Sequence, residues 1–168
     1  MKKRIGAFVG KFYPPHIGHV WVVDNLVNSL DELYIIISKN DIRNKEIEKN
    51  TNFKILNAEI IKGWFVEHFK NNNKIKVEIF DETNLRPYPE DRDKWAEKFK
   101  KQFPQVNVKI ADESYRDYNQ IYFPEYEFLA IPRDVINIHS TMLRTDLNKH
   151  FDHLIEEAKP YFKEYIKE

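Results

Sequence analysis

The chain of 168 residues contains no cysteine and only four glycines. Without cysteine there is no disulfide, no thiolate nucleophile and no Cys-ligated zinc, and this absence is compatible with the expected cytoplasmic location. No run of eighteen apolar residues occurs, so neither a transmembrane helix nor a membrane partner is expected. The N-terminal sequence also lacks the features of a signal peptide.

The chain also has no net charge, because 27 Lys and Arg residues balance 27 Asp and Glu residues. A balanced chain gives no reason to expect a nucleic-acid partner or an anionic membrane surface. Any anion-binding site must therefore be local. The length favours a single domain over residues 1–168, with enough hydrophobic residues for a sizeable core.

Short apolar runs alternate with helical patterns along the chain. The runs predict five buried strands, at residues 4–10, 32–38, 74–80, 107–111 and 127–131. Helical spacing occurs over 17–30, from Phe53 to Trp64 and from Trp95 to Phe103, whereas the polar stretch 39–52 is predicted to be a loop. Helical segments follow Ile138, with Pro160 marking a break or a new first turn. This alternation predicts an α/β fold with a doubly wound parallel sheet and C-terminal helices.

The stretch Gly10 to His19, GKFYPPHIGH, follows the first predicted strand, where open α/β sheets usually bind phosphate. Gly10 permits an unusual φ as the chain leaves the strand. His16 and His19 lie one turn apart if a helix begins near Ile17, so both imidazoles face one point beside its N-terminus. That point favours anions, which predicts a phosphate site.

Two further residues of this stretch favour phosphate binding. Gly18 lets a phosphate approach the backbone, and Lys11 adds a positive charge. The spacing is neither a Walker A loop nor the G-x-G-x-x-G pattern. Two alternatives are that the histidines are metal ligands or ordinary surface residues on a capped helix. Because no carboxylate or third histidine stands nearby at ligand spacing, no protein metal site is expected.

A second motif, IHSTMLR, spans Ile138 to Arg144. Ser140 or Thr141 can cap a short helix whose N-terminus faces a phosphate, and Arg144 can reach the same anion. The alternative is a plain N-cap with a solvated arginine.

Together these motifs resemble the signatures of the nucleotidylyltransferase superfamily, G-x-F-x-P-x-H-x-G-H and Ile-Ser-Ser/Gly-Thr-x-x-Arg. The Lys-Phe-Tyr-Pro variant resembles the nicotinamide mononucleotide (NMN) adenylyltransferase domain of NadR-type proteins. The resemblance implies a Rossmann-like nucleotidylyltransferase fold. His139 stands where the family usually has serine, and its role is left open. The residues that the resemblance implies for catalysis are His16, His19, Arg144 and Lys11, and those for binding ATP and its phosphates are Gly10, Phe12, Gly18, Ser140, Thr141 and His139.

The middle of the chain resembles the NadR-type subgroup in segments 41–43, 81–95 and 111–118. Trp95 is either a core residue, because it continues a stripe to Phe103, or an aromatic platform for the cationic ring of NMN. Tyr88 is a candidate second wall of that site. Arg43 and Arg92 are candidate contacts to NMN or phosphate, with a solvated arginine as the alternative for each.

The resemblance implies transfer of AMP from ATP to NMN, giving NAD and pyrophosphate, with Mg²⁺ arriving on ATP. NadR-type proteins can also carry a DNA-binding domain and a kinase, but this chain has no room for either, so neither activity is expected. The alternatives are another nucleotidylyltransferase, such as a phosphopantetheine adenylyltransferase or a cytidylyltransferase, or a non-catalytic nucleotide sensor. The preference for NMN over nicotinate mononucleotide, a homo-oligomeric state and regulation are left open.

Overall fold

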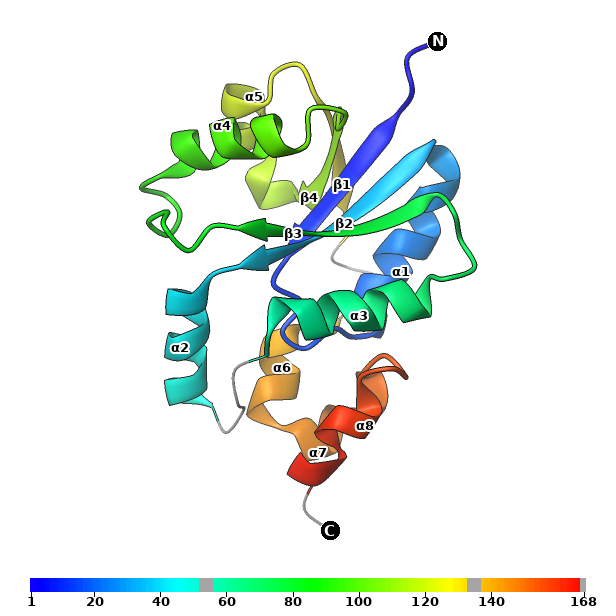
Figure 1. The fold of residues 1–168 in the computed structure, drawn as a ribbon, viewed down its shortest axis with the longest axis vertical. Helices are drawn as coiled ribbons and strands as arrows, with labels where there is room; N and C mark the ends of the chain where they lie inside the picture. The colour runs from blue at the N-terminus through cyan, green and yellow to red at the C-terminus, as the bar shows by residue number, and fades with distance from the viewer. Residues whose placement is uncertain (52–55, 133–136, 167–168) are drawn as a thin grey trace.

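A five-stranded parallel sheet forms the centre of the computed structural model, which describes residues 1–51, 56–132 and 137–166 (Figure 1). The strand order is β3-β2-β1-β4-β5, and every neighbouring pair is parallel. Each strand lies within one residue of its predicted bounds, which confirms the doubly wound sheet. The strands are β1 (Ile5–Gly10), β2 (Glu32–Lys39), β3 (Ile75–Asp81), β4 (Val108–Asp112) and β5 (Glu127–Ile131).

Two apolar layers cover the sheet, one on each face. Helices α1 (Ile17–Leu26) and α3 (Ala58–His68) belong to the first layer, and α4 (Arg92–Gln102) and α5 (Arg116–Tyr122) lie with the second. Strand β2 contributes to both layers, because successive side chains of a strand point to opposite faces. Ile35 and Ile37 join the first apolar cluster, whereas Ile36 joins the second.

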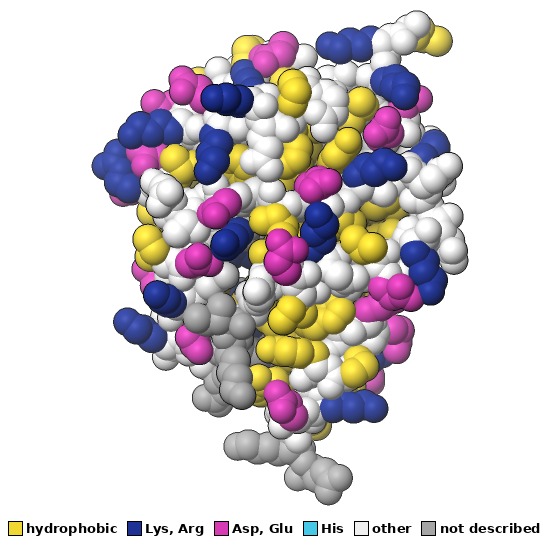
Figure 2. Space-filling view, viewed as in Figure 1, with side chains coloured by type: hydrophobic (Ala, Val, Ile, Leu, Met, Phe, Trp, Pro, Cys, Tyr) yellow, Lys and Arg dark blue, Asp and Glu magenta, His cyan; other side chains and the backbone are white. Residues whose placement is uncertain are grey.

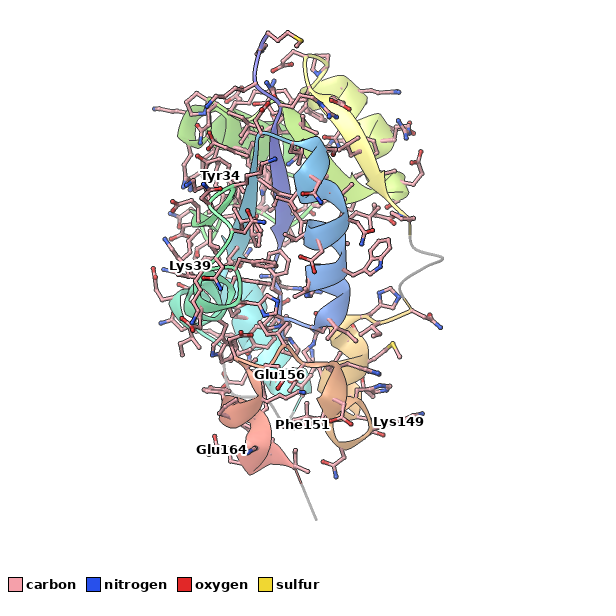
Figure 3. All side chains as sticks on the ribbon, turned by 90° about the vertical axis from the view of Figure 1, so that its right-hand side faces the viewer. Tyr34, Lys39, Lys149, Phe151, Glu156 and Glu164 are labelled. Carbon is pink, nitrogen blue, oxygen red and sulfur yellow. The ribbon has the colours of Figure 1, made fainter. Side chains whose placement is uncertain are left out.

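The C-terminal segment forms short helices beyond the carboxyl ends of the strands, as Figures 1 and 3 show from two sides. Pro160 lies in the first turn of α8, which is one of the two alternatives predicted for it, a helix break or a new first turn. Buried Leu143, Leu154 and Phe162 join this segment to the first apolar cluster. The helices are α6 (Ser140–Thr145), α7 (Leu147–His150) and α8 (Lys159–Phe162).

The predicted loop at residues 39–52 is wrong, because most of it forms helix α2 (Asp41–Asn50). The side chain of Asn40 caps this helix by accepting a hydrogen bond of 3.0 Å from the amide of Arg43. Only Asn44 is buried within it, so the helix carries no apolar stripe that periodicity could detect. The predicted stripe from Phe53 begins outside the described residues, and α3 starts at Ala58.

The surface carries both signs of charge. Figure 2 shows Lys and Arg side chains mixed with Asp and Glu over the face in view, as the balanced composition predicts. Among the described residues, no helix combines the length and the hydrophobicity needed to cross a membrane.

Candidate active site

The two sequence motifs meet at the carboxyl edge of the sheet, beside the point where the strand order reverses. Strand β1 lies between β2 and β4, and such a switch point is where open α/β sheets bind ligands. A pocket of about 430 Å³ lies here, and a second of about 260 Å³ lies between α2 and α6. The first pocket contains five predicted residues, Gly10, Lys11, Tyr88, Arg92 and Trp95. The second contains three, Arg43, Thr141 and Arg144.

His16 and His19 form a reciprocal cap at the start of α1, which begins at Ile17 as predicted. His16 Nδ1 accepts a hydrogen bond of 3.1 Å from the amide of Gly18, and His19 Nδ1 accepts one of 3.1 Å from the amide of His16. The rings stack with their centroids 3.7 Å apart. Because each Nδ1 accepts a hydrogen bond from a backbone amide, each neutral ring carries its own hydrogen on Nε2. Both imidazoles therefore keep an Nε2–H donor that the cap does not use.

Both histidines are neutral at neutral pH. Burial, with smaller effects from neighbouring His139 and His153, lowers the pKa of His16 to about 4. Burial, followed by the proximity of His16 and His139, lowers the pKa of His19 well below its usual value. The pair consequently offers hydrogen-bond donors rather than fixed positive charge.

The late motif is hydrogen-bonded to the backbone of the first motif. Arg144 Nη1 donates to the carbonyl oxygen of Tyr13 at 2.5 Å, across 131 positions of sequence. Ser140 Oγ donates to the carbonyl oxygen of Pro14 at 3.0 Å, and Arg144 Nη2 donates to Thr141 Oγ1 at 3.1 Å. These bonds hold the two motifs together at the edge of the sheet.

The predicted capping role of Ser140 or Thr141 is wrong. His139 occupies the N-cap position of α6, with no side-chain capping bond, and Ser140 is the first helical residue. The Ser140 hydroxyl turns instead to the first loop, where it donates to the carbonyl oxygen of Pro14.

The predicted unusual φ at Gly10 is also wrong. The positive φ of this loop, 52°, belongs to Phe12. Gly10 is needed for space instead, because a Cβ there would lie 3.1 Å from the Phe12 ring. The buried Phe12 ring packs edge-on against His19, with centroids 4.8 Å apart, and so supports that imidazole.

Lys11 lines the first pocket and is close enough to Arg43 and Arg144 of the second for their charges to act on it. Its Nζ donates to Asn44 Oδ1 at 3.3 Å. Burial lowers the pKa of Lys11, Glu82 opposes that shift, and Arg43 and Arg144 add to it. These three charged side chains come from different elements, so the lysine lies within a mixed charge cluster at the edge of the sheet.

Trp95 packs against the core and also lines the first pocket, so its predicted role as an aromatic platform for NMN stays a prediction. One face of the indole stacks on Phe99 in the second apolar cluster, with centroids 5.2 Å apart, while the ring also lines the first pocket. Its Nε1 donates to Glu82 Oε2 at 2.6 Å, and Ser38 Oγ donates to the other oxygen of Glu82 at 2.5 Å. Glu82 thus fixes the plane of the indole, a function that the sequence analysis missed.

Tyr88 and the two candidate arginines differ in their placement. Tyr88 is exposed and packs against Tyr118, with ring centroids 6.0 Å apart. The Arg92 guanidinium lies 5.8 Å from the ring centroid of Tyr122. Arg43 pairs with Glu46 at 2.9 Å and lines the second pocket, so it is not brought together with Trp95.

Two buried polar residues of the first pocket were also missed, Lys109 and Asn119. Lys109 is the second residue of β4, and a charged residue inside a short apolar run was the available signal. Asn119 lies on α5, and its sequence context carried no comparable signal.

No group of three or more His, Cys, Asp or Glu side chains that could hold a metal ion occurs in the part of the chain that the structure describes. The stacked histidines use Nδ1 for the helix cap and have no carboxylate beside them in the described hydrogen bonds. This arrangement does not fit the metal-ligand alternative for the pair.

The sheet order, the histidine cap after β1 and the late arginine motif define a nucleotidylyltransferase-like α/β fold. The chain is 28% identical to the trifunctional NAD biosynthesis/regulator protein NadR of Escherichia coli over 170 residues, covering 96% of this chain and 41% of NadR. The curated NadR relatives are therefore more than twice as long as the matched region. No protein-family model matches the chain.

Solved structures show the same fold. A NadR protein in complex with NR matches with a TM-score of 0.78 and 22% identity, covering 95% of this chain and 45% of that one. A bifunctional NMN adenylyltransferase/ADP ribose pyrophosphatase from Francisella tularensis matches with a TM-score of 0.71 and 14% identity, covering 97% and 49%. These matches confirm the predicted fold and the predicted resemblance to NadR-type nucleotidylyltransferases.

Proposed function

We propose that this chain is an NMN adenylyltransferase, which transfers AMP from ATP to NMN and releases NAD and pyrophosphate. The observation that carries the proposal is the joining of the two motifs: Arg144 and Ser140 bond to the loop that leads to His16 and His19. That junction lies next to a pocket lined by Trp95. The sequence similarity to NadR and the fold of the F. tularensis protein, whose name includes NMN adenylyltransferase, support the same activity.

In the proposed reaction an oxygen of the NMN 5′-phosphate attacks the α-phosphorus of ATP. A new P–O bond forms as the bond to the pyrophosphate oxygen breaks in line, and pyrophosphate leaves with the bonding electrons. A phosphate monoester has a second pKa near 6, so its attacking oxygen is already ionised at neutral pH and needs no general base. The protein must therefore position two anions and stabilise the charge that moves to the leaving group.

The residues supply complementary donors for this task. The two Nε2–H groups of His16 and His19 are proposed to donate to phosphate oxygens, since their Nδ1 atoms are committed to the helix cap. Lys11 supplies positive charge from the first pocket and Arg144 from the second, and the N-terminus of α1 adds its dipole. Gly10, Phe12 and Gly18 are proposed to shape the loop around the phosphates. Mg²⁺ is proposed to enter on ATP, whose triphosphate offers the hard oxygen ligands that this ion prefers.

In the first pocket, the nicotinamide ring is proposed to stack on Trp95, with Tyr88 and Arg92 at the rim. The pocket is lined by the aromatic rings of Trp95, Tyr88, Tyr115 and Tyr118, a lining that suits a flat cationic ring. Arg43, Thr141 and His139 are assigned to the ATP side, because Arg43 and Thr141 line the second pocket and His139 is close enough to lower the pKa of both motif histidines. The single-domain organisation and a homo-oligomeric state stay predictions.

An acceptor panel tests the proposal. The protein is incubated with Mg²⁺ and ATP plus NMN, nicotinate mononucleotide or phosphopantetheine, or with CTP and a phosphorylated alcohol, and pyrophosphate release is followed. The expected result is release that depends on ATP and a pyridine mononucleotide. Release only with phosphopantetheine or with CTP would identify a different nucleotidylyltransferase, and nucleotide binding without any release would identify a sensor.

A further inference from the structure

Lys109 is a buried lysine that has no acidic partner in the described part of the chain. It is 5% exposed and is the second residue of β4. Its Nζ lies 4.1, 4.8 and 4.9 Å from the ring centroids of Phe99, Trp95 and Phe123. No ion pair or hydrogen bond to a described residue accompanies these ring contacts, and burial is the sole cause of its shifted pKa.

Asn119, on α5, has an unused acceptor. Its Nδ2 donates to the carbonyl oxygen of Tyr115 at 2.8 Å, which sets the orientation of the amide. Its Oδ1 is buried without a hydrogen-bond partner among the described residues. A buried acceptor without a partner is costly to folding, so such atoms call for a specific explanation.

Lys109 and Asn119 line the same pocket as Trp95. The carboxylates of this pocket are already engaged: buried Asp91 binds Arg86 at 2.9 Å, half-buried Glu82 accepts bonds from Trp95 and Ser38, and Asp112 accepts bonds from Ser114. Among the buried side chains that line the pocket, Lys109 Nζ is thus a donor without a described acceptor, and Asn119 Oδ1 is an acceptor without a described donor. A primary carboxamide presents the complement, a carbonyl oxygen that accepts and an NH₂ group that donates.

We infer that Lys109 and Asn119 recognise the carboxamide of the pyridine ring and thereby select NMN over nicotinate mononucleotide, an inference that rests on the proposed function. Lys109 donates to the carboxamide oxygen, and Asn119 Oδ1 accepts from the carboxamide NH₂ group. The ring itself lies against Trp95, between these groups and the pocket opening.

The hydrogen-bond acceptor, Asn119 Oδ1, is what distinguishes the two mononucleotides. A carboxylate has no hydrogen to give to Asn119, and its second oxygen would face another oxygen. The ammonium of Lys109 attracts a carboxylate, but burial lowers its pKa to about 7, so much of its charge is absent at neutral pH. The reduced charge also weakens repulsion between Lys109 and the positively charged pyridinium ring.

The test compares NMN and nicotinate mononucleotide as acceptors, with ATP as the donor, in the full chain. Wild type is expected to show the higher kcat/KM with NMN. Asn119→Leu removes the hydrogen-bond acceptor and keeps a side chain of similar size. The kcat/KM for NMN is therefore expected to fall about tenfold, while the kcat/KM for nicotinate mononucleotide changes less than twofold. Lys109→Met is expected to lower kcat/KM for both mononucleotides, because each loses the hydrogen bond that Lys109 donates. The KM for ATP is expected to stay within twofold in both variants.

Asn107→Leu is a matched control, since Asn107 also bonds backbone through its amide but lies outside the pocket lining. It is expected to leave the acceptor ratio unchanged even if it lowers stability. Equal losses for both acceptors in Asn119→Leu, or a wild-type preference for nicotinate mononucleotide, would overturn the inference while leaving adenylyl transfer in place. No transfer to either acceptor by wild type would instead overturn the proposed function, and the inference with it.

Discussion

Replacing Lys109 with methionine is expected to stabilise the folded chain, and to do so more at low pH than at high pH. Methionine keeps an unbranched apolar stem against Phe99, whose ring centroid lies 4.1 Å from Nζ, and removes the buried ammonium group. A buried ion without a partner in an apolar layer destabilises the fold. Its replacement therefore preserves the apolar packing and removes the desolvation penalty.

The magnitude follows from the pKa of Lys109, which burial lowers from 10.5 to about 7. Since one pKa unit corresponds to about 1.4 kcal/mol, the charged form costs roughly 5 kcal/mol of folding free energy. Contacts with three aromatic rings favour the ammonium form by about 1–2 kcal/mol and offset part of this cost. A net penalty of about 3 kcal/mol remains where the lysine is fully charged.

The sign of the pH dependence is set by which state holds the proton. The unfolded chain keeps the Lys109 proton up to a pKa of 10.5, whereas burial alone lowers the pKa of the folded chain to about 7 and the ring contacts raise it part of the way back. The penalty is therefore complete below pH 7, shrinks as the pH rises between these values, and is absent above 10.5.

Urea denaturation at pH 6 and pH 9 measures this effect. Lys109→Met is expected to exceed wild type in unfolding free energy by about 3 kcal/mol at pH 6, with a difference at least ~1 kcal/mol smaller at pH 9. The control is Lys76→Met at an exposed site on β3, where a change within about 0.5 kcal/mol is expected. A difference that is equal at both pH values, or a less stable Lys109→Met, would refute the reasoning.

Three further predictions address the motif histidines and the aromatic pocket. His19→Asn keeps an acceptor for the His16 amide but removes the Nε2–H group, so kcat is expected to fall by about 10² with little change in the KM for ATP, and near-normal kcat would exclude His19 from the chemistry. Trp95→Ala is expected to raise the Kd for NMN about tenfold in calorimetry while ATP binding stays within twofold, whereas equal losses would indicate structural damage. The pKa of His16 is about 4 in the folded chain and 6.5 in the unfolded chain. Up to about 3 kcal/mol of stability is therefore expected to be lost as the pH falls through this range. His16→Asn should remove that part of the acid dependence in denaturation curves, and an unchanged dependence would contradict the assignment.

Local sequence patterns predicted the five strands and the histidine pair, because both depend on neighbours within one element. The spacing of His16 and His19 already places their rings together once α1 begins at Ile17. Helix α2 was missed because it is polar on most sides and is defined by its Asn40 cap rather than by an apolar stripe.

Other features depend on residues that only the fold brings together. The positive φ of Phe12 and the need for Gly10 both come from the packing of one ring, which no local pattern encodes. Ser140 turns to the Pro14 carbonyl because the late motif packs on the first loop. Likewise, Lys109 and Asn119 line one pocket only because α5 packs beside β4, so their pairing could not be predicted from spacing.

Following the α-phosphorus of ATP tests the central claim most directly. ATP labelled at this atom is incubated with the protein, Mg²⁺ and NMN, and the products are separated and counted. The label is expected to appear in NAD, with one pyrophosphate released for each NAD formed. Label that stays in ATP despite measurable ATP and NMN binding, or that appears as free AMP without NAD, would contradict this claim.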